Sequence, residues 1–230
     1  MRLDYFIANA TELSRRDAKK AISAGLVQVN EQTCRKAGAP VSPDSLITLE
    51  GDPLSLPVDR YLMLHKPKGI ISATTDSQQP TALDLLPAAL RRGLHIAGRL
   101  DTDTTGLLLL TTDGQWSHRI TSPRVDCPKT YRVTLSAAID TGAIVRLEQG
   151  VLLRDDPTPT KPASVCKLDE RLIDLTISEG RYHQIKRMLA AVGNHVEGLH
   201  RWKIGDIVLE PELAPGQYRE LTAEQVDCVA

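Results

Sequence analysis

Apolar positions in the first fifty residues repeat first with a helical period and then with a strand period. Apolar side chains recur at helical spacing over residues 3–10. Ser14 has the type of side chain that caps a helix, and a second amphipathic segment runs from it to Gly25, a residue suited to ending a helix. Residues 26–30 alternate between apolar and polar, which predicts a strand.

Strand patterns dominate the rest of the chain. The predicted strands are residues 61–65, 69–73, 95–97, 107–111, 130–135, 164–168, 172–177 and 195–199. Predicted helices lie near residues 81–86, 114–121, 141–148, 182–192 and 222–228. Many strands with irregularly placed helices favour an α+β fold with a mainly antiparallel sheet over a doubly wound parallel sheet.

A polar segment with two prolines separates these regions. Its sequence over residues 51–57 is GDPLSLP, which is typical of a connector. We therefore expect a small domain at residues 1–50, a linker at residues 51–58 and a larger domain at residues 59–230.

Composition is that of a globular protein, with 41% hydrophobic and 25% charged residues. The formal net charge of −1 argues superficially against a nucleic-acid partner. However, residues 205–230 carry six acidic side chains against Arg219 alone, so the preceding residues are net positive. A weakly acidic total can therefore conceal basic surfaces that bind RNA.

Other features narrow the classes of protein that fit. The four cysteines are widely spaced without a Cys-x-x-Cys pair, and no apolar stretch is long enough for a transmembrane helix. The start of the chain does not look like a signal peptide. We expect a cytoplasmic monomer without a membrane partner. The histidines are not spaced as zinc ligands, so no zinc site is indicated. The sequence has no phosphate-binding glycine loop, so no nucleotide cofactor is indicated.

The segment at residues 98–114, GRLDTDTTGLLLLTTDG, carries the most distinctive chemistry. It places Asp101 close to Arg99 on a loop that leads into an apolar strand, and such a loop can hold a reacting carboxylate rigidly. The pattern also opens like a calcium loop, but Thr112 stands where that loop needs a glutamate. A third interpretation is a solvated turn at the start of a strand.

Basic residues form two clusters at helical spacing. The first comprises Arg15, Arg16, Lys19 and Lys20. The second lies on a predicted helix that starts near Gly180, whose other face is apolar, and comprises His183, Lys186 and Arg187. Each cluster is compatible with a solvated helix face or with binding of RNA phosphates.

Four motifs occur in a particular order: GRLDTDTTGLLLLTTDG at residues 98–114, QWSHRITSP at 115–123, KTYRVTL at 129–135 and SEGRYHQIKRM at 178–188. Together they resemble the RsuA family of ribosomal RNA pseudouridine synthases. The two helices, glycine and Val-x-Val-Asn strand near the N-terminus resemble the alpha-L RNA-binding motif of a small-subunit ribosomal protein. The resemblance extends over the whole chain, and it implies an alpha-L RNA-binding domain followed by a pseudouridine synthase catalytic domain.

The resemblance also implies roles for individual residues. Asp101 follows Arg-Leu, where the family has its catalytic aspartate, and a single carboxylate can serve this chemistry without a metal or cofactor. Lys186 follows Gln184-Ile185, the position implied to pair with that aspartate and keep it ionised. Tyr131 is implied to stack on the target base and could relay a proton. Whether the aspartate attacks the ring or the ribose stays open.

Further residues are candidates for binding RNA. Because a stacked uridine cannot reach a recessed carboxylate, Arg99 is a candidate to fill the gap left when the base flips out. Asp103 is interpreted as ordering the loop. The candidates for substrate binding outside the loop are Arg15, Arg16, Lys19, Lys20, His183 and Arg187. Weaker candidates for phosphate contacts are Lys66, Lys68, Arg119, Arg124, Lys129, Arg201 and Lys203.

The predicted function is isomerisation of one uridine in 16S ribosomal RNA, with a partly assembled small subunit as the partner. Three alternatives remain. The first is a synthase acting on 23S RNA, and the second is a non-catalytic RNA-binding or ribosome-assembly factor. The third is a nucleoside or glycoside hydrolase that uses Asp101 and Asp103 as paired carboxylates, although this alternative does not explain the basic N-terminal helix.

Overall fold

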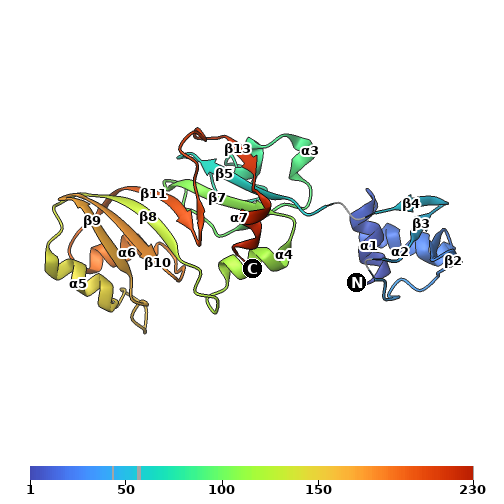
Figure 1. Ribbon diagram of the computed structural model, residues 1–230, viewed down its shortest axis with the longest axis horizontal. Coiled ribbons are helices and arrows are strands. Elements are labelled where there is room, and N and C mark those ends of the chain that lie inside the picture. Colours follow the sequence, from blue (N-terminus) through green and yellow to red (C-terminus); the bar gives the residue numbers. More distant parts are fainter. Residues whose placement is uncertain (43, 56–57, 230) are drawn as a thin grey trace. The chain divides into compact units, whose positions relative to one another are not determined.

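The computed structural model describes residues 1–42, 44–55 and 58–229, and the chain divides into two compact units, residues 1–58 and 59–230 (Figure 1). The described part of the chain contains no helix with the length and apolar character needed to cross a membrane.

The first unit is two helices followed by a small antiparallel sheet. Its elements are α1 (Leu3–Ala10), α2 (Arg15–Ala24), β1 (Val27–Val29), β2 (Gln32–Thr33), β3 (Ile47–Leu49) and β4 (Asp52–Leu54), and the strand order is β2-β1-β3-β4. The Ser14 hydroxyl accepts a hydrogen bond from the Asp17 backbone NH, and Gly25 ends α2 with φ 83°. Both helices bury their apolar faces against β1 and β3.

The end of this unit differs from the sequence prediction. Residues 51–58 were expected to be a linker, but Asp52–Leu54 form β4, which pairs with β3. The Glu50-Gly51 turn reverses the chain, with φ of 54° and 95° at these residues, and Pro53 is tolerated because β4 is an edge strand. Residues 56 and 57 of the predicted linker lie outside the described residues.

The second unit is built on one large mixed sheet. Its strands are β5 (Tyr61–Lys66), β6 (His95–Ala97), β7 (Thr105–Thr111), β8 (Lys129–Leu135), β9 (Ser164–Asp169), β10 (Leu172–Ile177), β11 (Val196–Ile204), β12 (Ile207–Val208) and β13 (Tyr218–Glu220). Its helices are η1 (Ala82–Leu85), α3 (Ala88–Arg91), α4 (Gly114–Thr121), α5 (Thr141–Gln149), α6 (Gln184–Ala191) and α7 (Ala223–Asp227). The order β13-β5-β7-β11-β8-β10-β9 is antiparallel except for the parallel pair β7 and β11.

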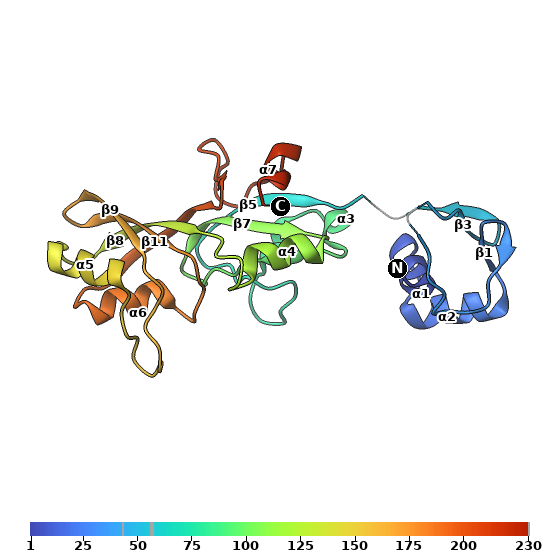
Figure 2. The ribbon, with the colours of Figure 1, turned by 60° about the horizontal axis from the view of Figure 1, so that its bottom comes forward.

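Both faces of this sheet are covered, which explains the unbroken run of leucines in β7. Leu107 and Leu109 pack in one core cluster with α4, whereas Leu108 and Leu110 pack in another with η1. The second cluster continues under α5 and α6, which lie on the same side of β8 and β9 (Figure 2). The buried strand β7 is therefore a rigid base for the loop that precedes it.

Residues 69–73, predicted as a strand, instead form a turn and an isolated bridge between Ile71 and Thr81. Gly69 has φ 88° and turns the chain directly after β5. The Ser72 hydroxyl donates to the Leu100 carbonyl at 2.7 Å and accepts from the Leu100 NH at 2.9 Å. This segment therefore braces the loop at residues 98–104 instead of extending the sheet.

Candidate active site

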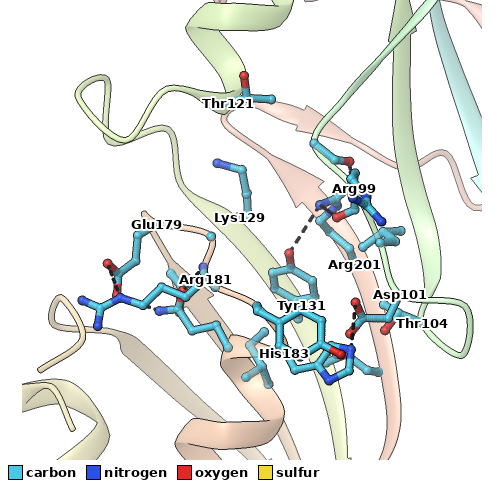
Figure 3. A pocket seen from close by; sticks show the side chains of 18 of the residues that line it. Arg99, Asp101, Thr104, Thr121, Lys129, Tyr131, Glu179, Arg181, His183 and Arg201 are labelled. Atoms are coloured by element: carbon cyan, nitrogen blue, oxygen red, sulfur yellow. Dashed lines mark hydrogen bonds and ion pairs between the residues drawn. The ribbon is translucent and has the colours of Figure 1, made fainter. Parts of the chain in front are cut away.

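A cavity of about 610 Å³ opens beside the loop between β6 and β7. Side chains from this loop, from β8, from β11 and from the start of α6 line it, including Arg99, Asp101, Thr104, Tyr131, His183, Lys186 and Arg201. Figure 3 shows Asp101, Tyr131 and His183 pointing into it from three different segments. A concave site of this size with converging polar groups has the character of an active site.

The backbone of the loop that carries Asp101 is held from two sides. Arg201 donates to the Gly98 carbonyl at 3.0 Å and to the Arg99 carbonyl at 3.4 Å. Ser72 holds both backbone groups of Leu100 on the other side. The carboxylate of Asp101 therefore projects from a backbone with little freedom to move, as the sequence pattern led us to expect.

Arg201 has a different role from the one predicted. It is only 1% exposed, and it donates to the Leu107 carbonyl at 2.9 Å and to the Tyr131 hydroxyl at 3.4 Å. Two other predicted phosphate contacts, Lys66 and Lys129, are also buried. All three side chains point inward from their strands and donate to backbone carbonyls, Lys66 to Pro67, Lys129 to Cys127 and Arg201 to Leu107.

Two nitrogen groups flank the Asp101 carboxylate. His183 Nε2 lies 3.6 Å from one oxygen, and Lys186 Nζ lies 3.6 Å from the other. The Asp101 side chain retains about a third of its exposure. Asp101 thus lines the cavity with a lysine and a histidine beside its carboxylate.

The structure gives Lys186 a second partner that the sequence analysis did not predict. Its ammonium donates to the two oxygens of Asp103 at 2.7 and 2.8 Å, closer than its approach to Asp101. These hydrogen bonds hold the pKa of Asp103 below its usual value. Lys186 thus bridges two carboxylates of one loop, and the loop is tied to α6 through this side chain.

The helix that carries Lys186 begins later than predicted. The pattern placed its start near residues 180–182, but α6 begins at Gln184, and His183 has left-handed backbone angles of φ 46° and ψ 36°. The Gln184 side chain is buried and accepts from the Arg181 NH while donating to Glu179. This closed turn aims the His183 ring at Asp101 instead of along the helix face.

Tyr131 lies in the wall of the cavity on β8, with only 8% of its surface exposed. Its hydroxyl accepts from Arg201, and the guanidinium carbon of Arg201 lies 5.8 Å from the ring centroid. The ring is thus fixed in place before any ligand binds.

Arg99 and Arg187, which were both predicted to contact RNA, have different surroundings. Arg99 is exposed at the edge of the cavity. Arg187 donates to the Arg154 carbonyl at 2.5 Å and to the Tyr182 carbonyl at 3.3 Å, and it lies 4.0 Å from Asp156. Arg187 therefore anchors the loop between α5 and β9, a role that its helical spacing did not indicate.

In the first unit, the four basic side chains of α2 are all exposed. Lys20 pairs with Asp17 at 2.9 Å. Arg15 and Lys19 lie 3.6 and 3.9 Å from Asp4, a fully buried carboxylate whose pKa is lowered mainly by its hydrogen bond with Arg2. The buried Asp4 carboxylate thus helps to orient Arg15 and Lys19.

Lys66 and Ser72 both support the loop, which was not predicted, and only Lys66 has a feature in the sequence that indicates this role. Lys66 is inward-facing, as the strand alternation with Leu62 and Leu64 could have indicated, and it donates to the Thr102 carbonyl at 3.4 Å. Ser72 had no such signal, because its contact with Leu100 depends on the folded chain. Among the described residues, no three His, Cys, Asp or Glu side chains gather as metal ligands.

The chain belongs to the RNA pseudouridylate synthase family, whose match spans residues 60–191, and residues 1–47 match the S4 domain. It is 49% identical over 227 residues to the ribosomal small subunit pseudouridine synthase A of Pasteurella multocida, with 98% of each chain covered. It is 47% identical to the protein of the same name from Escherichia coli K12, with 100% of each covered. A solved structure described as a pseudouridylate synthase aligns with 46% identity and a TM-score of 0.74 over 100% of both chains.

These findings confirm the predicted family and the α+β architecture of an RNA-binding unit followed by a synthase domain. As a member of this family the chain is an isomerase. The interpretations as a hydrolase or as a calcium-binding loop have no support from these relatives.

Proposed function

We propose that this protein converts one uridine of 16S ribosomal RNA to pseudouridine, with Asp101 as its catalytic carboxylate. The observation that carries the proposal is the placement of Asp101 on a braced loop in the cavity, with His183 and Lys186 both 3.6 Å from its oxygens. The choice of 16S RNA rests on full-length relatives that are named as small-subunit enzymes.

The reaction requires no net gain or loss of atoms. The bond between the ribose and the uracil nitrogen breaks, the uracil turns, and a bond from the ribose to a ring carbon forms while that carbon loses its proton and the nitrogen gains one. An ionised Asp101 can attack the ribose or the ring in the first step. Because the carboxylate is recessed, the uridine must leave the RNA stack to reach it.

The surrounding residues have separate tasks in this proposal. Lys186 places a positive charge beside the Asp101 carboxylate, and this charge compensates the carboxylate when a bound base excludes water from the cavity. The preformed Tyr131 ring stacks on the flipped uracil, and Arg99 at the cavity edge occupies the gap that the base leaves. His183 orients the second carboxylate oxygen.

The S4 unit contributes affinity rather than chemistry. The basic side chains of α2 contact RNA phosphates, which position the enzyme without reading the sequence. We propose that a partly assembled small subunit is the substrate, since a uridine inside the finished particle would be less accessible. Recognition then depends on RNA shape as well as on the sequence around the uridine.

The test is to incubate the protein with protein-free 16S RNA, protein-free 23S RNA and small-subunit assembly intermediates, and to map pseudouridine by carbodiimide-dependent reverse-transcription stops. We expect one new stop in 16S RNA and a faster reaction on an intermediate. A new stop only in 23S RNA would contradict the assignment of the target. No new stop with any substrate would contradict the enzymatic function and favour an assembly factor.

A further inference from the structure

The side chains of Tyr182 and His183 form a stacked pair of rings at the edge of the cavity. Their centroids are 3.8 Å apart and their planes differ by 20°. Tyr182 is 77% exposed and both residues line the cavity. In a chain with only five tyrosines, two tryptophans and one phenylalanine, such a large exposed ring beside the active site requires an explanation.

The backbone is constrained so that these two neighbours stack. Side chains of adjacent residues normally point in different directions, and the left-handed conformation of His183 brings the rings together. Such a conformation is unfavourable for a residue with a side chain and persists only when its surroundings enforce it. Arg187 supplies part of that enforcement, because its guanidinium donates to the Tyr182 carbonyl and its NH donates to the His183 carbonyl.

The two stacked rings extend from Asp101 to the protein surface. At one end His183 Nε2 lies 3.6 Å from Asp101, and at the other end the Tyr182 ring is open to solvent. A flat group stacked on Tyr182 would therefore lie one ring beyond His183, next to the position where a uridine must sit to reach Asp101. Figure 3 shows the His183 ring beside Asp101. Tyr131 comes from β8, so it belongs to a different segment from the Tyr182–His183 pair.

We propose that Tyr182 stacks on an unpaired RNA base that neighbours the target uridine, with His183 as the spacer that fixes its distance from Asp101. The proposal rests on the proposed function for the identity of the RNA. When the uridine leaves the stack, its neighbour loses a stacking partner, and the Tyr182 ring replaces that partner. An aromatic face does this for any base, so the contact positions the RNA without selecting its sequence.

The test compares the full-length protein with Tyr182→Phe, Tyr182→Leu and, as a control remote from the cavity, Leu168→Ala on the exposed face of β9. Binding and single-turnover pseudouridine formation are measured on one RNA fragment that contains the mapped uridine. A second set of fragments carries 2-aminopurine at either neighbouring position, because its fluorescence falls when it stacks. Since Tyr182 is exposed, thermal melting should be unchanged in both of its variants.

We expect Tyr182→Phe and Leu168→Ala to bind like the wild type. Tyr182→Leu should bind about 5- to 150-fold more weakly, which is the range for removal of one base–aromatic stack. At saturating protein, its rate should recover towards the wild-type rate, and one 2-aminopurine position should be brighter than in the wild-type complex.

Two outcomes would overturn the inference. One is wild-type binding by Tyr182→Leu. The other is loss of binding by Tyr182→Phe, which would indicate that the hydroxyl matters instead of the ring. If the wild type forms pseudouridine on the fragment and Tyr182→Leu binds it equally well, only the stacking contact is contradicted. If the wild type forms no pseudouridine on any RNA, the proposed function itself is contradicted.

Discussion

The ammonium of Lys186 donates hydrogen bonds to both carboxylate oxygens of Asp103, at 2.7 and 2.8 Å. Its 3.6 Å distance from Asp101 is longer, so the lysine is shared unequally between two carboxylates of the same loop. This arrangement holds the loop against α6 while leaving Asp101 without a strong hydrogen bond to Lys186. A carboxylate that is paired loosely stays available as a nucleophile.

Lys186→Met is expected to slow pseudouridine formation while RNA binding weakens only modestly. The substitution removes the ammonium that lies 3.6 Å from Asp101 and the hydrogen bonds to Asp103 that tie the loop to α6. The measurement is the single-turnover rate at saturating RNA. Asp103→Asn is the matched control, because it keeps Lys186 beside Asp101 and should retain measurable activity. Full activity in Lys186→Met would make that residue an ordinary surface cation.

Gly106→Ala is expected to destabilise the second unit and disturb the site. Gly106 has φ 107°, and an added Cβ would lie 2.1 Å from the Arg201 carbonyl oxygen across the parallel pair β7 and β11. A loss of about 1–3 kcal/mol in the free energy of unfolding is expected from chemical denaturation. Gly114→Ala serves as the control, because nothing lies within 4 Å of its added Cβ and it starts α4. Equal stability of the two variants would show that this close approach is not a constraint.

Lys66 is expected to make stability depend on pH in the alkaline range. Its burial lowers the pKa of its ammonium from 10.5 to about 8, so the charged form is disfavoured in the folded protein. Between these values the unfolded chain binds more protons, and the stability of the wild type must therefore rise with pH. The cost of the buried charge is fully present below about pH 8.

Lys66→Met removes this titration. Between about pH 7.5 and about pH 9.5, the free energy of unfolding of the wild type should rise by about 1–2 kcal/mol relative to the variant. Chemical denaturation of both proteins at the two pH values measures the difference. If the free energy of unfolding changed equally in both proteins between the two pH values, the Lys66 ammonium would titrate alike in the folded and unfolded chains.

How much of the site could be predicted from the sequence depends on how local each feature is. The Ser14 cap, Gly25 and the apolar strand after Asp101 follow from neighbouring residues, and the structure has all three. The buried role of Arg201 depends on the parallel pairing of β11 with β7, which joins segments far apart in the chain. A basic residue in a strand gives no local sign of such burial, so its sequence position alone favours a phosphate contact.

The same limit applies to α6. The apolar face expected on this helix is buried at Ile185, Met188 and Leu189, whereas Val192, which follows the end of the helix, is only partly buried. The left-handed turn at His183 was not predicted, because helical periodicity continues smoothly through this residue. The turn is imposed by the buried Gln184 and its contact with Glu179. The motif resemblance pointed to Asp101, Tyr131 and Lys186, which line one cavity, but it did not indicate which carboxylate Lys186 binds more closely.

The basic side chains of α2 are expected to control how RNA binding depends on salt. Replacing Arg15, Arg16, Lys19 and Lys20 by Ala should flatten the slope of log affinity against log salt by up to about 0.7–0.9 for each RNA phosphate that the variant no longer neutralises. A salt titration on one 16S fragment measures this slope. Arg171→Ala, which removes a surface ion pair with Glu197 on the second unit, is the control and should leave the slope unchanged.

A variant with only two substitutions controls for misfolding of the quadruple variant. Arg16→Ala with Lys20→Ala leaves Arg15 and Lys19 beside the buried Asp4, so the packing of α1 and α2 is retained. Its slope should change by about half as much as that of the quadruple variant. Identical slopes for all proteins would place this helix away from the RNA, and the role proposed for the S4 unit would have to be withdrawn.

The most direct test of the account is pseudouridine formation by Asp101→Asn on 16S RNA. Asparagine keeps the size and polarity of the side chain and removes its nucleophilic charge, so the fold should be unchanged and RNA affinity should stay within about threefold. Carbodiimide mapping after single-turnover incubation should then show no product above the level without enzyme. Product formation at a rate close to that of the wild type would contradict the assignment of Asp101 as the catalytic residue.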